Sequence, residues 1–431
     1  MRLGSFFVLR RTDRIQKTRF QKTFMRLLDF LKNLYHYALA LLGNIWYWFP
    51  SRTIFLIGVT GTKGKSTVVE LMNAVLEAAG KKTALLSSVR VKILDRSEKN
   101  VTGNTMPGRF FIHRFLRDAV RAGAEFAILE VTSQGVVQYR HRFLNFDAAL
   151  FLNLHPEHIE SHGSFEGYRS AKVQFFSDVA RRSAKPRKLF FVNQEDHSRE
   201  YFFDAVHGFG DFYYFSREHF IATRLMHGKV SIGDWLANDF NLENAAAVAK
   251  VAEAMGIDWG VVQRALAAFP GVPGRMDVIQ EKPFRVVVDY AHTPDSLRAA
   301  YQALTQGRKK LICVLGSDGG GRDKWKRPEL GKIAGELCRD IVLTEENPYD
   351  EDPRAIIGGI RKGIPAAFPE SHIYEFVDRR AAIAKAISFA KSGDTVVMTG
   401  KGSEGYIRRA HGEKIPWDER SVAEELLRAS R

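Results

Sequence analysis

A turn rich in glycine and lysine at residues 60–67, TGTKGKST, has the residue types and spacing of a phosphate-binding loop. An apolar, β-branched stretch at 53–59 precedes it, and an apolar helical pattern that stops at Gly80 follows it. Glycines let backbone N–H groups converge on phosphate oxygens, and the start of a helix adds positive potential. In such a loop Lys65 would reach the terminal phosphates and Ser66 would hold Mg²⁺. Val59 stands where the common loop has a glycine, so the match is to a shorter G-T-x-G-K-[ST] variant.

Polar groups also follow an apolar strand pattern at 126–129, which ends in Glu130. A carboxylate at the carboxyl end of a strand that faces a phosphate loop is suited to Mg²⁺. Farther along, NLHPEHIESHG at 153–163 and YRSAK at 168–172 place His158 and Lys172 among polar neighbours. The helical segment that starts with DFNLEN at 239, and the strand RVVVDYAHTP at 285–294, again carry polar groups at an element's end.

These motifs, in register from residue 53 to residue 431, resemble the Mur ligase family. Within it, the closest likeness is to the branch that adds the third amino acid to UDP-N-acetylmuramoyl-dipeptide. The resemblance implies a cytoplasmic, ATP-dependent ligase of peptidoglycan precursor synthesis, which activates a carboxylate as an acyl phosphate and joins it to an amine. Its substrates would be ATP, an amino acid and a muramoyl-peptide-like acceptor, and its metal cofactor would be two Mg²⁺ ions.

The resemblance also implies roles for individual residues. The expected catalytic residues are Lys65, Glu130, His158 and Lys172. The expected metal ligands are Ser66, Glu130, His158 and, if it is carbamylated as in the family, Lys172. Carbamylation turns the lysine cation into a carboxylate-like ligand. The expected ATP contacts are Gly61, Thr62, Gly64, Lys65, Ser66, Thr67, Asn241, Asn244, Asp289 and His292. The expected substrate contacts are Thr105, Arg140, Arg322, Asn347 and Glu404.

The sequence departs from the family pattern at Gln134, Glu157, Tyr349 and Ser403, which replace His, Asp, Arg and His. The diaminopimelate-adding enzymes carry an arginine at the position of Tyr349 to grip the distal carboxylate, so diaminopimelate is not supported. Glu404 could still receive an ammonium group of the amine, which leaves lysine or another amino acid open. The departures also leave open a nucleotide-binding scaffold that has lost catalysis, against which the retained catalytic residues argue.

The pattern of elements indicates an α/β fold, with a P-loop ATPase domain at 51–272 followed by a Rossmann-like C-terminal domain at 273–431. The Pro and Gly residues at 270–274 favour a boundary there. Cys313 and Cys338 lack a spacing typical of a metal site or a disulfide. They therefore predict thiols that simply pack, in a reducing compartment.

Residues 1–50 are of a different kind, a basic leader followed by an apolar helix. Much of the net charge of +15 lies in residues 1–26, which contain eight Lys and Arg residues and a single acidic residue, Asp13. No small-residue cleavage site of a signal peptide follows. No nucleic-acid-binding module accompanies the charge, so nucleic acid is not an expected partner.

The apolar segment at 27–49 ends in aromatic residues and lacks charged side chains from Asn33 to Phe49. A single membrane span would put the phosphate loop outside the cell, where ATP is scarce, so spanning is disfavoured. Two interpretations are left. The segment could lie in the membrane interface, with Trp46, Tyr47 and Trp48 at head-group depth and residues 1–49 in peripheral contact with the inner face of the cytoplasmic membrane. Alternatively, it could dock on the protein's own body.

The leader also stands where the family has a UDP-binding domain. Such a domain needs on the order of 100 residues, and only about 50 precede the phosphate loop. A full uridine pocket is therefore not expected. The acceptor could be lipid-linked, or it could be a soluble UDP-muramoyl peptide that the central domain holds alone.

Overall fold

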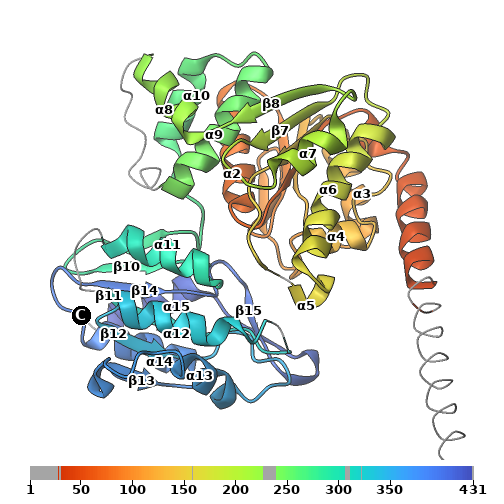
Figure 1. Ribbon diagram of the computed structural model, residues 1–431. Helices are drawn as coiled ribbons and strands as arrows, with labels where there is room; N and C mark the ends of the chain where they lie inside the picture. Colours follow the sequence, from red (N-terminus) through yellow and green to blue (C-terminus); the bar gives the residue numbers. More distant parts are fainter. Residues whose placement is uncertain are drawn as a thin grey trace, which may run out of the picture.

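The structure is a computed structural model that describes residues 28, 31–157, 159–226, 239–305, 311–321 and 323–429. Two sheets with helices on both faces dominate it, one in each half of the chain (Figure 1). The predicted α/β class is confirmed. The predicted residues His158 and Arg322 lie outside the described ranges.

The first sheet has the strand order β4-β3-β2-β5-β1-β6-β7-β8. Its parallel core reads as continuous apolar runs, as expected for strands that are covered on both faces. The strands are β1 (Phe55–Thr60), β2 (Thr83–Leu86), β3 (Arg90–Ile93), β4 (Arg96–Lys99), β5 (Phe126–Glu130), β6 (Ala148–Phe151), β7 (Leu189–Asn193) and β8 (Asp211–Phe215). At one edge of this sheet β3 pairs antiparallel with both β2 and β4, and the other described pairs are parallel.

Alternate side chains of these strands enter two separate apolar cores. The helices α2 (Lys65–Ala78), α9 (Asp239–Ala254) and α10 (Trp259–Ala268) cover one face. The other face is covered by α3 (Arg109–Arg121), α6 (Phe165–Arg182) and α7 (Arg199–Val206). The short helices α4 (Ser133–Val137) and α5 (Ile159–His162) and the helix α8 (Arg217–Met226) complete this half.

The second sheet has the order β13-β12-β11-β14-β10-β9, and only β9 is antiparallel. Its strands are β9 (Asp277–Gln280), β10 (Arg285–Val288), β11 (Leu311–Leu315), β12 (Asp340–Leu343), β13 (Ile373–Glu375) and β14 (Thr395–Met398). One face packs against α11 (Pro294–Thr305), α12 (Lys326–Leu337) and α13 (Pro353–Arg361), and the other against α14 (Arg379–Ser388) and α15 (Glu419–Ala429). A hairpin of β15 (Tyr406–Arg408) and β16 (Lys414–Pro416) extends from this half.

Side-chain caps define where several of these helices begin. Ser164 accepts a hydrogen bond from the N–H of Gly167 at the start of α6, the helix that carries Lys172. Asp378 accepts one from the N–H of Ala381 at the start of α14. A side-chain oxygen at this position replaces the missing carbonyl partner of a first-turn N–H group. The local sequence therefore sets the register of both helices.

The prediction of two packed thiols is wrong, because Cys313 in β11 and Cys338 after α12 form a disulfide. Their Cα atoms lie 6.1 Å apart, within the range that a disulfide can bridge. The distance is set by α12 packing back on β11. The separation of 25 residues carries no signal of that packing.

The N-terminal helix, residues 31–46, docks on the central half through one of its faces. Ala40 is fully buried, and the ring of Tyr37 packs edge-on against Phe143 at 5.0 Å between ring centroids. Gly43 lies against His113 of α3, so closely that a Cβ at Gly43 would approach the His113 ring at 3.0 Å. This face of the helix therefore packs on the protein's own body. Among the described helices, none combines the length and apolar character needed to cross a bilayer.

We expect the stability of the protein to fall in acid because His113 is buried under this helix. Burial lowers the pKa of His113 to about 4, although the carbonyl of Ala40 acts in the opposite direction. The folded state therefore binds this proton less readily than the unfolded state, whose histidine has its ordinary pKa near 6.5. The free energy of unfolding should drop by about 3 kcal/mol as the pH falls from 7 towards 4. Urea unfolding across this range measures the loss, which should shrink in His113→Leu.

Candidate active site

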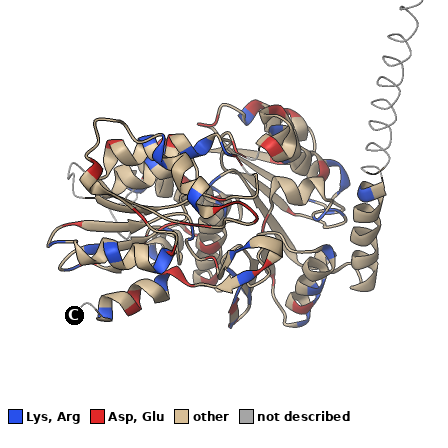
Figure 2. Cartoon of the chain, turned by 90° about the horizontal axis from the view of Figure 1, so that it is seen from below, with Lys and Arg blue, Asp and Glu red and all other residues tan. Residues whose placement is uncertain are grey.

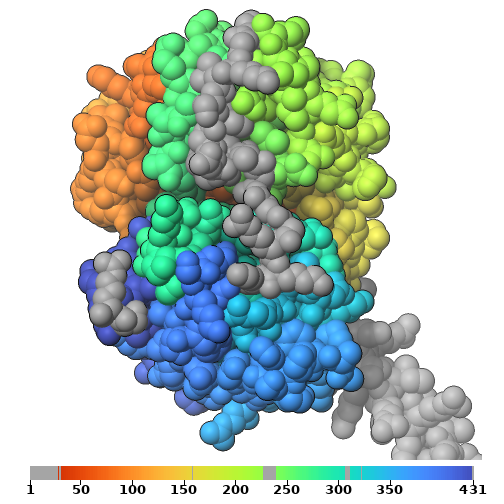
Figure 3. All heavy atoms as spheres, turned by 90° about the vertical axis from the view of Figure 1, so that its left-hand side faces the viewer, coloured from red at the N-terminus to blue at the C-terminus, as the bar shows by residue number. Residues whose placement is uncertain are grey.

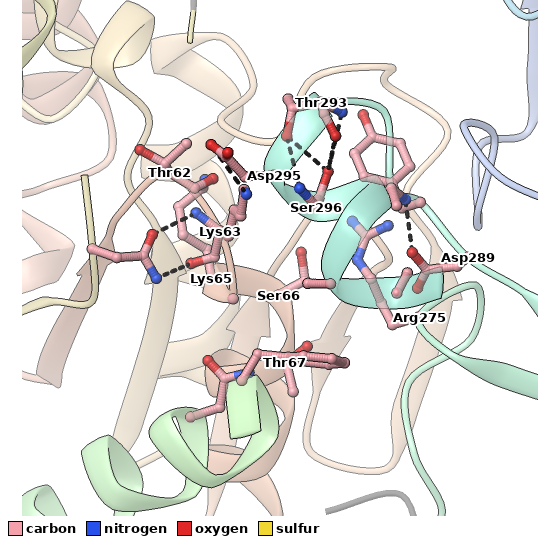
Figure 4. Close-up of a pocket in the computed structure, with 18 of the residues that line it drawn as sticks. Thr62, Lys63, Lys65, Ser66, Thr67, Arg275, Asp289, Thr293, Asp295 and Ser296 are labelled. Atoms are coloured by element: carbon pink, nitrogen blue, oxygen red, sulfur yellow. Dashed lines mark hydrogen bonds and ion pairs between the residues drawn. The ribbon is translucent and has the colours of Figure 1, made fainter. Parts of the chain in front are cut away.

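A cavity of about 370 Å³ lies between the two halves, at the carboxyl ends of β1, β5 and β10. From the central half it is lined by the phosphate loop together with Glu130, Glu157, Asn241 and Asn244. From the C-terminal half it is lined by Arg275 and the segment from Asp289 to Ser296. Figure 3 shows the two halves meeting along a seam. Figure 4 shows Lys63, Lys65 and Ser66 on one side of the cavity, opposite Arg275, Asp289 and Thr293.

The phosphate loop connects β1 directly to α2, as the sequence predicts. Gly64 caps α2 in a left-handed conformation, with φ of 81°. The side chain of Asn244, from α9, lies so close that a Cβ at Gly64 would clash with its Oδ1 atom. The predicted adenine contacts Asn241 and Asn244 therefore stand next to the loop, and both are buried.

The variant Gly64→Ala should lose nucleotide affinity, by about tenfold or more. The substitution forces a side chain into a left-handed backbone and into Asn244 at the same time. Titration calorimetry with Mg·ATP measures the change. Gly80→Ala is the matched control at the other end of α2, because Gly80 has φ of 74° but no atom within 4 Å of the added Cβ. Equal affinities of the two variants would contradict the prediction.

The partly buried Lys65 and the buried Lys172 meet at the loop. Nζ of Lys65 donates to the carbonyls of Gly61 and Thr62, each at 2.9 Å. Nζ of Lys172, from α6, donates to the same Gly61 carbonyl at 2.8 Å. Burial lowers the pKa of Lys65, and it holds the pKa of Lys172 well below its usual value, where the charge of Lys65 lowers it further. Lys65 lines the cavity, whereas Lys172 reaches the loop from α6 without lining it.

Glu130 ends β5 beside these lysines and is almost fully buried. Its Oε1 atom accepts a hydrogen bond from the N–H of Ser88 at 2.7 Å, and the hydroxyls of Ser66 and Ser88 lie 2.8 Å apart. Burial raises the pKa of Glu130, and the charge of Lys65 opposes the rise. A divalent cation would relieve the desolvation of this carboxylate, so Ser66 and Glu130 fit an Mg²⁺ ion.

Within the described ranges, no three His, Cys, Asp or Glu side chains converge as a metal site. The predicted ligand set contains one such side chain, Glu130, besides His158, which lies outside those ranges. The other two predicted ligands are Ser66 and Lys172. A second metal position with several oxygen ligands would require Lys172 in its carbamylated form, which supplies carboxylate-like oxygens.

The C-terminal wall of the cavity is built around Asp289, which ends the β10 segment. Its two carboxylate oxygens accept from the N–H groups of Met276 at 2.7 Å and Ala291 at 2.8 Å. Asp289 thereby holds the β9 and β10 ends together. Arg275 places its guanidinium 3.9 Å from the ring centre of Tyr290, a geometry typical of a cation–π contact. The sequence predicts no role for Arg275 or Tyr290.

Side chains also join the two halves across the cavity. His292 donates from Nδ1 to the carbonyl of Tyr290 at 2.8 Å, and its Nε2 atom lies 3.2 Å from Oε1 of Glu157. Burial lowers the pKa of His292, but the hydrogen bond and charge of Glu157 outweigh it and raise the pKa. Nζ of Lys63 lies 3.9 Å from Asp295 of α11. Glu157 was identified only as a departure from the family pattern, yet it makes one of these contacts.

The predicted amine contacts Asn347 and Glu404 lie together in a buried network of the C-terminal half. Nδ2 of Asn347 donates to Glu404 and to Asp318, each at 3.0 Å. The fully buried Lys401 donates to Asn347 at 2.9 Å and to Glu404 at 2.5 Å. Lys401 lies two residues before Ser403, and the sequence predicts no role for it.

The predicted substrate contacts Thr105 and Arg140 differ in position relative to the cavity. Thr105 lines the cavity. Arg140 does not line it, because its guanidinium donates to Oε1 of Gln138 and to the carbonyl of Met106. Since Met106 follows Thr105 directly, Arg140 supports the segment that carries Thr105.

Comparison with known proteins agrees with this arrangement. Residues 59–252 match the Mur ligase middle domain, and residues 274–402 match the Mur ligase, glutamate ligase domain. The chain is 37% identical to the UDP-N-acetylmuramoyl-L-alanyl-D-glutamate--2,6-diaminopimelate ligase of Syntrophomonas wolfei subsp. wolfei, over 91% of this chain and 82% of that protein. It is 36% identical to the UDP-N-acetylmuramyl-tripeptide synthetase of a Roseiflexus species, over 90% of this chain and 82% of that protein.

Solved structures give the same result. A UDP-N-acetylmuramoyl-L-alanyl-D-glutamate--2,6-diaminopimelate ligase superposes with a TM-score of 0.58 at 27% identity, covering 90% of this chain and 82% of that one. A Yersinia pestis folylpolyglutamate synthase/dihydrofolate synthase, complexed with AMPPNP and an Mn ion, has a TM-score of 0.65 at 18% identity, covering 92% of this chain and 93% of that one. The latter likeness concerns the fold alone. The chain belongs to the Mur ligase family and is an ATP-dependent ligase.

Proposed function

We propose that this ligase adds an amino acid to a muramoyl-peptide-like carboxylate in the cytoplasm, through an acyl phosphate and with two Mg²⁺ ions. The observation that carries the proposal is the meeting of Lys65 and Lys172 at one loop carbonyl, beside Glu130, in a phosphate loop that lines a cavity between the two halves. The relatives named above act on such muramoyl peptides. The chain would be divided near residue 273 into a nucleotide-binding half and an amine-binding half.

In this mechanism the loop N–H groups and Lys65 hold the triphosphate of ATP, and Asn241 and Asn244 hold its adenine end. Bound Mg²⁺ would offset charge during phosphoryl transfer to the carboxylate. Glu130 and Ser66 would hold one ion, and His158 with carbamylated Lys172 would hold the other. Thr105 and Arg140 position the muramoyl-peptide-like acceptor, whose carboxylate is activated. Asp289 and His292 close the cavity from the C-terminal side and exclude water from the acyl phosphate.

The amine would be oriented by Arg322, Asn347 and Glu404. Glu404 is a partly exposed carboxylate whose buried neighbours hold it in place, which suits it to receive an ammonium group. Tyr349 replaces the arginine that would bind a distal carboxylate, and it leaves no cation at that position to pair with diaminopimelate. The amino acid is therefore best identified by assay.

The decisive experiment measures phosphate release from ATP across a panel of amino acids, including lysine and diaminopimelate, with UDP-muramoyl and lipid-linked muramoyl peptides as acceptors. Release that requires both an amine and an acceptor supports the proposal, and the preferred acceptor shows whether a uridine group is needed. Binding of Mg·ATP without release for any pair would instead support the scaffold alternative, which Gln134, Glu157, Tyr349 and Ser403 motivate.

Carbamylation of Lys172 can be tested separately. A neutral amine adds to CO₂ with loss of one proton, and burial favours the neutral form of Lys172. With ¹³C-labelled bicarbonate, we expect a carbamate NMR signal that is absent in Lys172→Met, together with a loss of activity of about 100-fold in this variant. A Lys172→Met enzyme as active as the wild type would remove Lys172 from the mechanism.

We further propose that residues 1–49 make peripheral contact with the inner face of the cytoplasmic membrane. This contact would bring the cavity near a lipid-linked acceptor, if the acceptor is of that kind. The leader carries a large excess of positive charge, and the apolar segment that follows ends in aromatic residues, both of which favour a membrane interface.

A further inference from the structure

The outward face of the N-terminal helix is apolar over its whole described length. Between Leu31 and Trp46, Ala38 and Leu39 on this face are partly buried, and six other apolar side chains at helical spacing are half or more exposed. They are Leu31 at 50%, Leu34 at 53%, Tyr35 at 61%, Leu42 at 55%, Ile45 at 50% and Trp46 at 72%. Trp48, in the turn after the helix, is 76% exposed. We call these seven side chains the outer stripe.

The outer stripe is distinct from the face that docks on the protein. Ala40, Gly43 and Asn44 lie on the opposite side of the helix and are buried. Figure 1 shows the helix at the side of the central half, with one flank turned away from the rest of the molecule. Both faces of the helix are thus apolar, whereas an ordinary surface helix has one polar face. A contiguous stripe of this kind marks an interaction surface.

The charges around the outer stripe indicate what it contacts. No Asp, Glu, Lys or Arg occurs from Asn33 to Phe49, whose one titratable base is His36, while Lys32 and Arg52 flank this segment. Both flanking residues are exposed. In Figure 2, where Lys and Arg are blue and Asp and Glu red, the ribbon of the described helix is almost entirely tan. The leader before it carries eight Lys and Arg residues in its first 26 positions. Positive charge beside an exposed apolar stripe complements a surface that is apolar inside and anionic outside.

We infer that the outer stripe lies in the interface of an anionic lipid bilayer, parallel to its plane, with Trp46 and Trp48 at the level of the head groups. The basic residues then face anionic lipid head groups. A second copy of the chain fits less well, since a dimer would bring two leaders of the same charge into one assembly. Among the described residues, none from 31–49 lines the cavity, so this contact leaves the active site open.

The test uses the full chain and vesicles of phosphatidylglycerol mixed with phosphatidylcholine, or of phosphatidylcholine alone. We expect sedimentation with the anionic vesicles, weaker binding to the neutral ones, and weakening by salt. The double variant Leu34→Glu/Leu42→Glu should bind at least tenfold less, because it places two charges in the stripe. Leu225→Glu/Met226→Glu is the matched control, since these α8 side chains are also apolar and exposed but lie elsewhere.

Circular dichroism and phosphate release should be unchanged in Leu34→Glu/Leu42→Glu, which separates this surface from the ligase function. The inference is overturned if the wild type does not bind anionic vesicles, or if both double variants bind as the wild type does. It is also overturned if the wild type does not bind vesicles but is a dimer by analytical ultracentrifugation, and Leu34→Glu/Leu42→Glu is a monomer. That result would assign the stripe to a second copy.

Discussion

Lys65→Ala is expected to lower kcat/KM for ATP-dependent ligation by about 10²- to 10³-fold. The ammonium group of Lys65 lies at the start of α2 and already points back at the loop carbonyls of Gly61 and Thr62. At this position it can stabilise the negative charge that develops on the transferred phosphoryl group. Because this charge grows in the transition state, the loss should fall mainly on kcat. Coupled measurement of phosphate release over a range of ATP concentrations separates kcat from KM.

Lys81→Ala is the control for this prediction. Lys81 follows the same helix at its opposite end and is exposed, so its removal changes the net charge equally without touching the cavity. It should leave both constants within about twofold of the wild type, because surface substitutions away from such a site have small effects. If Lys65→Ala kept a third or more of the wild-type activity, the loop would not be the site of phosphoryl transfer.

Arg379→Ala is expected to destabilise the C-terminal half by about 3–5 kcal/mol, the usual cost of leaving a buried charge without its partner. Arg379 and Glu419 are both fully buried, with Nη2 and Oε1 at 2.6 Å. The same guanidinium donates to the carbonyls of Glu345 at 3.0 Å and Thr399 at 2.8 Å. Urea unfolding followed by near-ultraviolet circular dichroism measures the loss.

The exposed neighbour provides the comparison for Arg379. Arg380 pairs with Glu425 at 2.8 Å, and both side chains are about half exposed. Arg380→Ala should therefore cost only about 0–1 kcal/mol. The double variant Arg379→Leu/Glu419→Leu should recover much of the stability, since it removes both buried charges. Equal losses of stability in Arg379→Ala and Arg380→Ala would show that the buried ion pair stabilises the protein no more than the exposed pair does.

Arg379 also ties two active-site loops together. Its carbonyl partners Glu345 and Thr399 stand two residues before Asn347 and Lys401, the members of the amine-site network. We therefore expect any folded Arg379 variant to raise KM for the amine more than KM for ATP, whose cavity lies elsewhere. A uniform loss of activity that simply follows the folded fraction would limit Arg379 to a structural role.

The phosphate loop and its two flanking elements could be predicted from the sequence because their conformation depends on neighbouring residues. The strand was expected at 53–59 and lies at Phe55–Thr60, and the helix starts at Lys65 as the loop pattern requires. Glu130 could be placed near the loop for a related reason. In a parallel sheet the carboxyl ends of adjacent strands meet at one edge, and β5 pairs with β1. The roles of these residues remain predictions.

Local pattern could not predict contacts between elements far apart in the chain. The disulfide of Cys313 and Cys338 depends on how α12 packs on β11. The contact between Glu157 and His292 joins residues separated by 135 positions. Neither distance is encoded in residue spacing, because each results from the packing of whole helices and sheets.

The sequence by itself determined the α/β class, the phosphate loop and the candidate residues around it, since side-chain periodicity and turn chemistry act over a few residues. Only the packed structure shows which of those residues share one cavity, that Arg379 and Lys401 hold the segments of the proposed amine contacts from within the core, and that the N-terminal helix has an exposed apolar face besides the covered one. Such properties arise only when elements pack, because burial depends on what lies opposite each side chain.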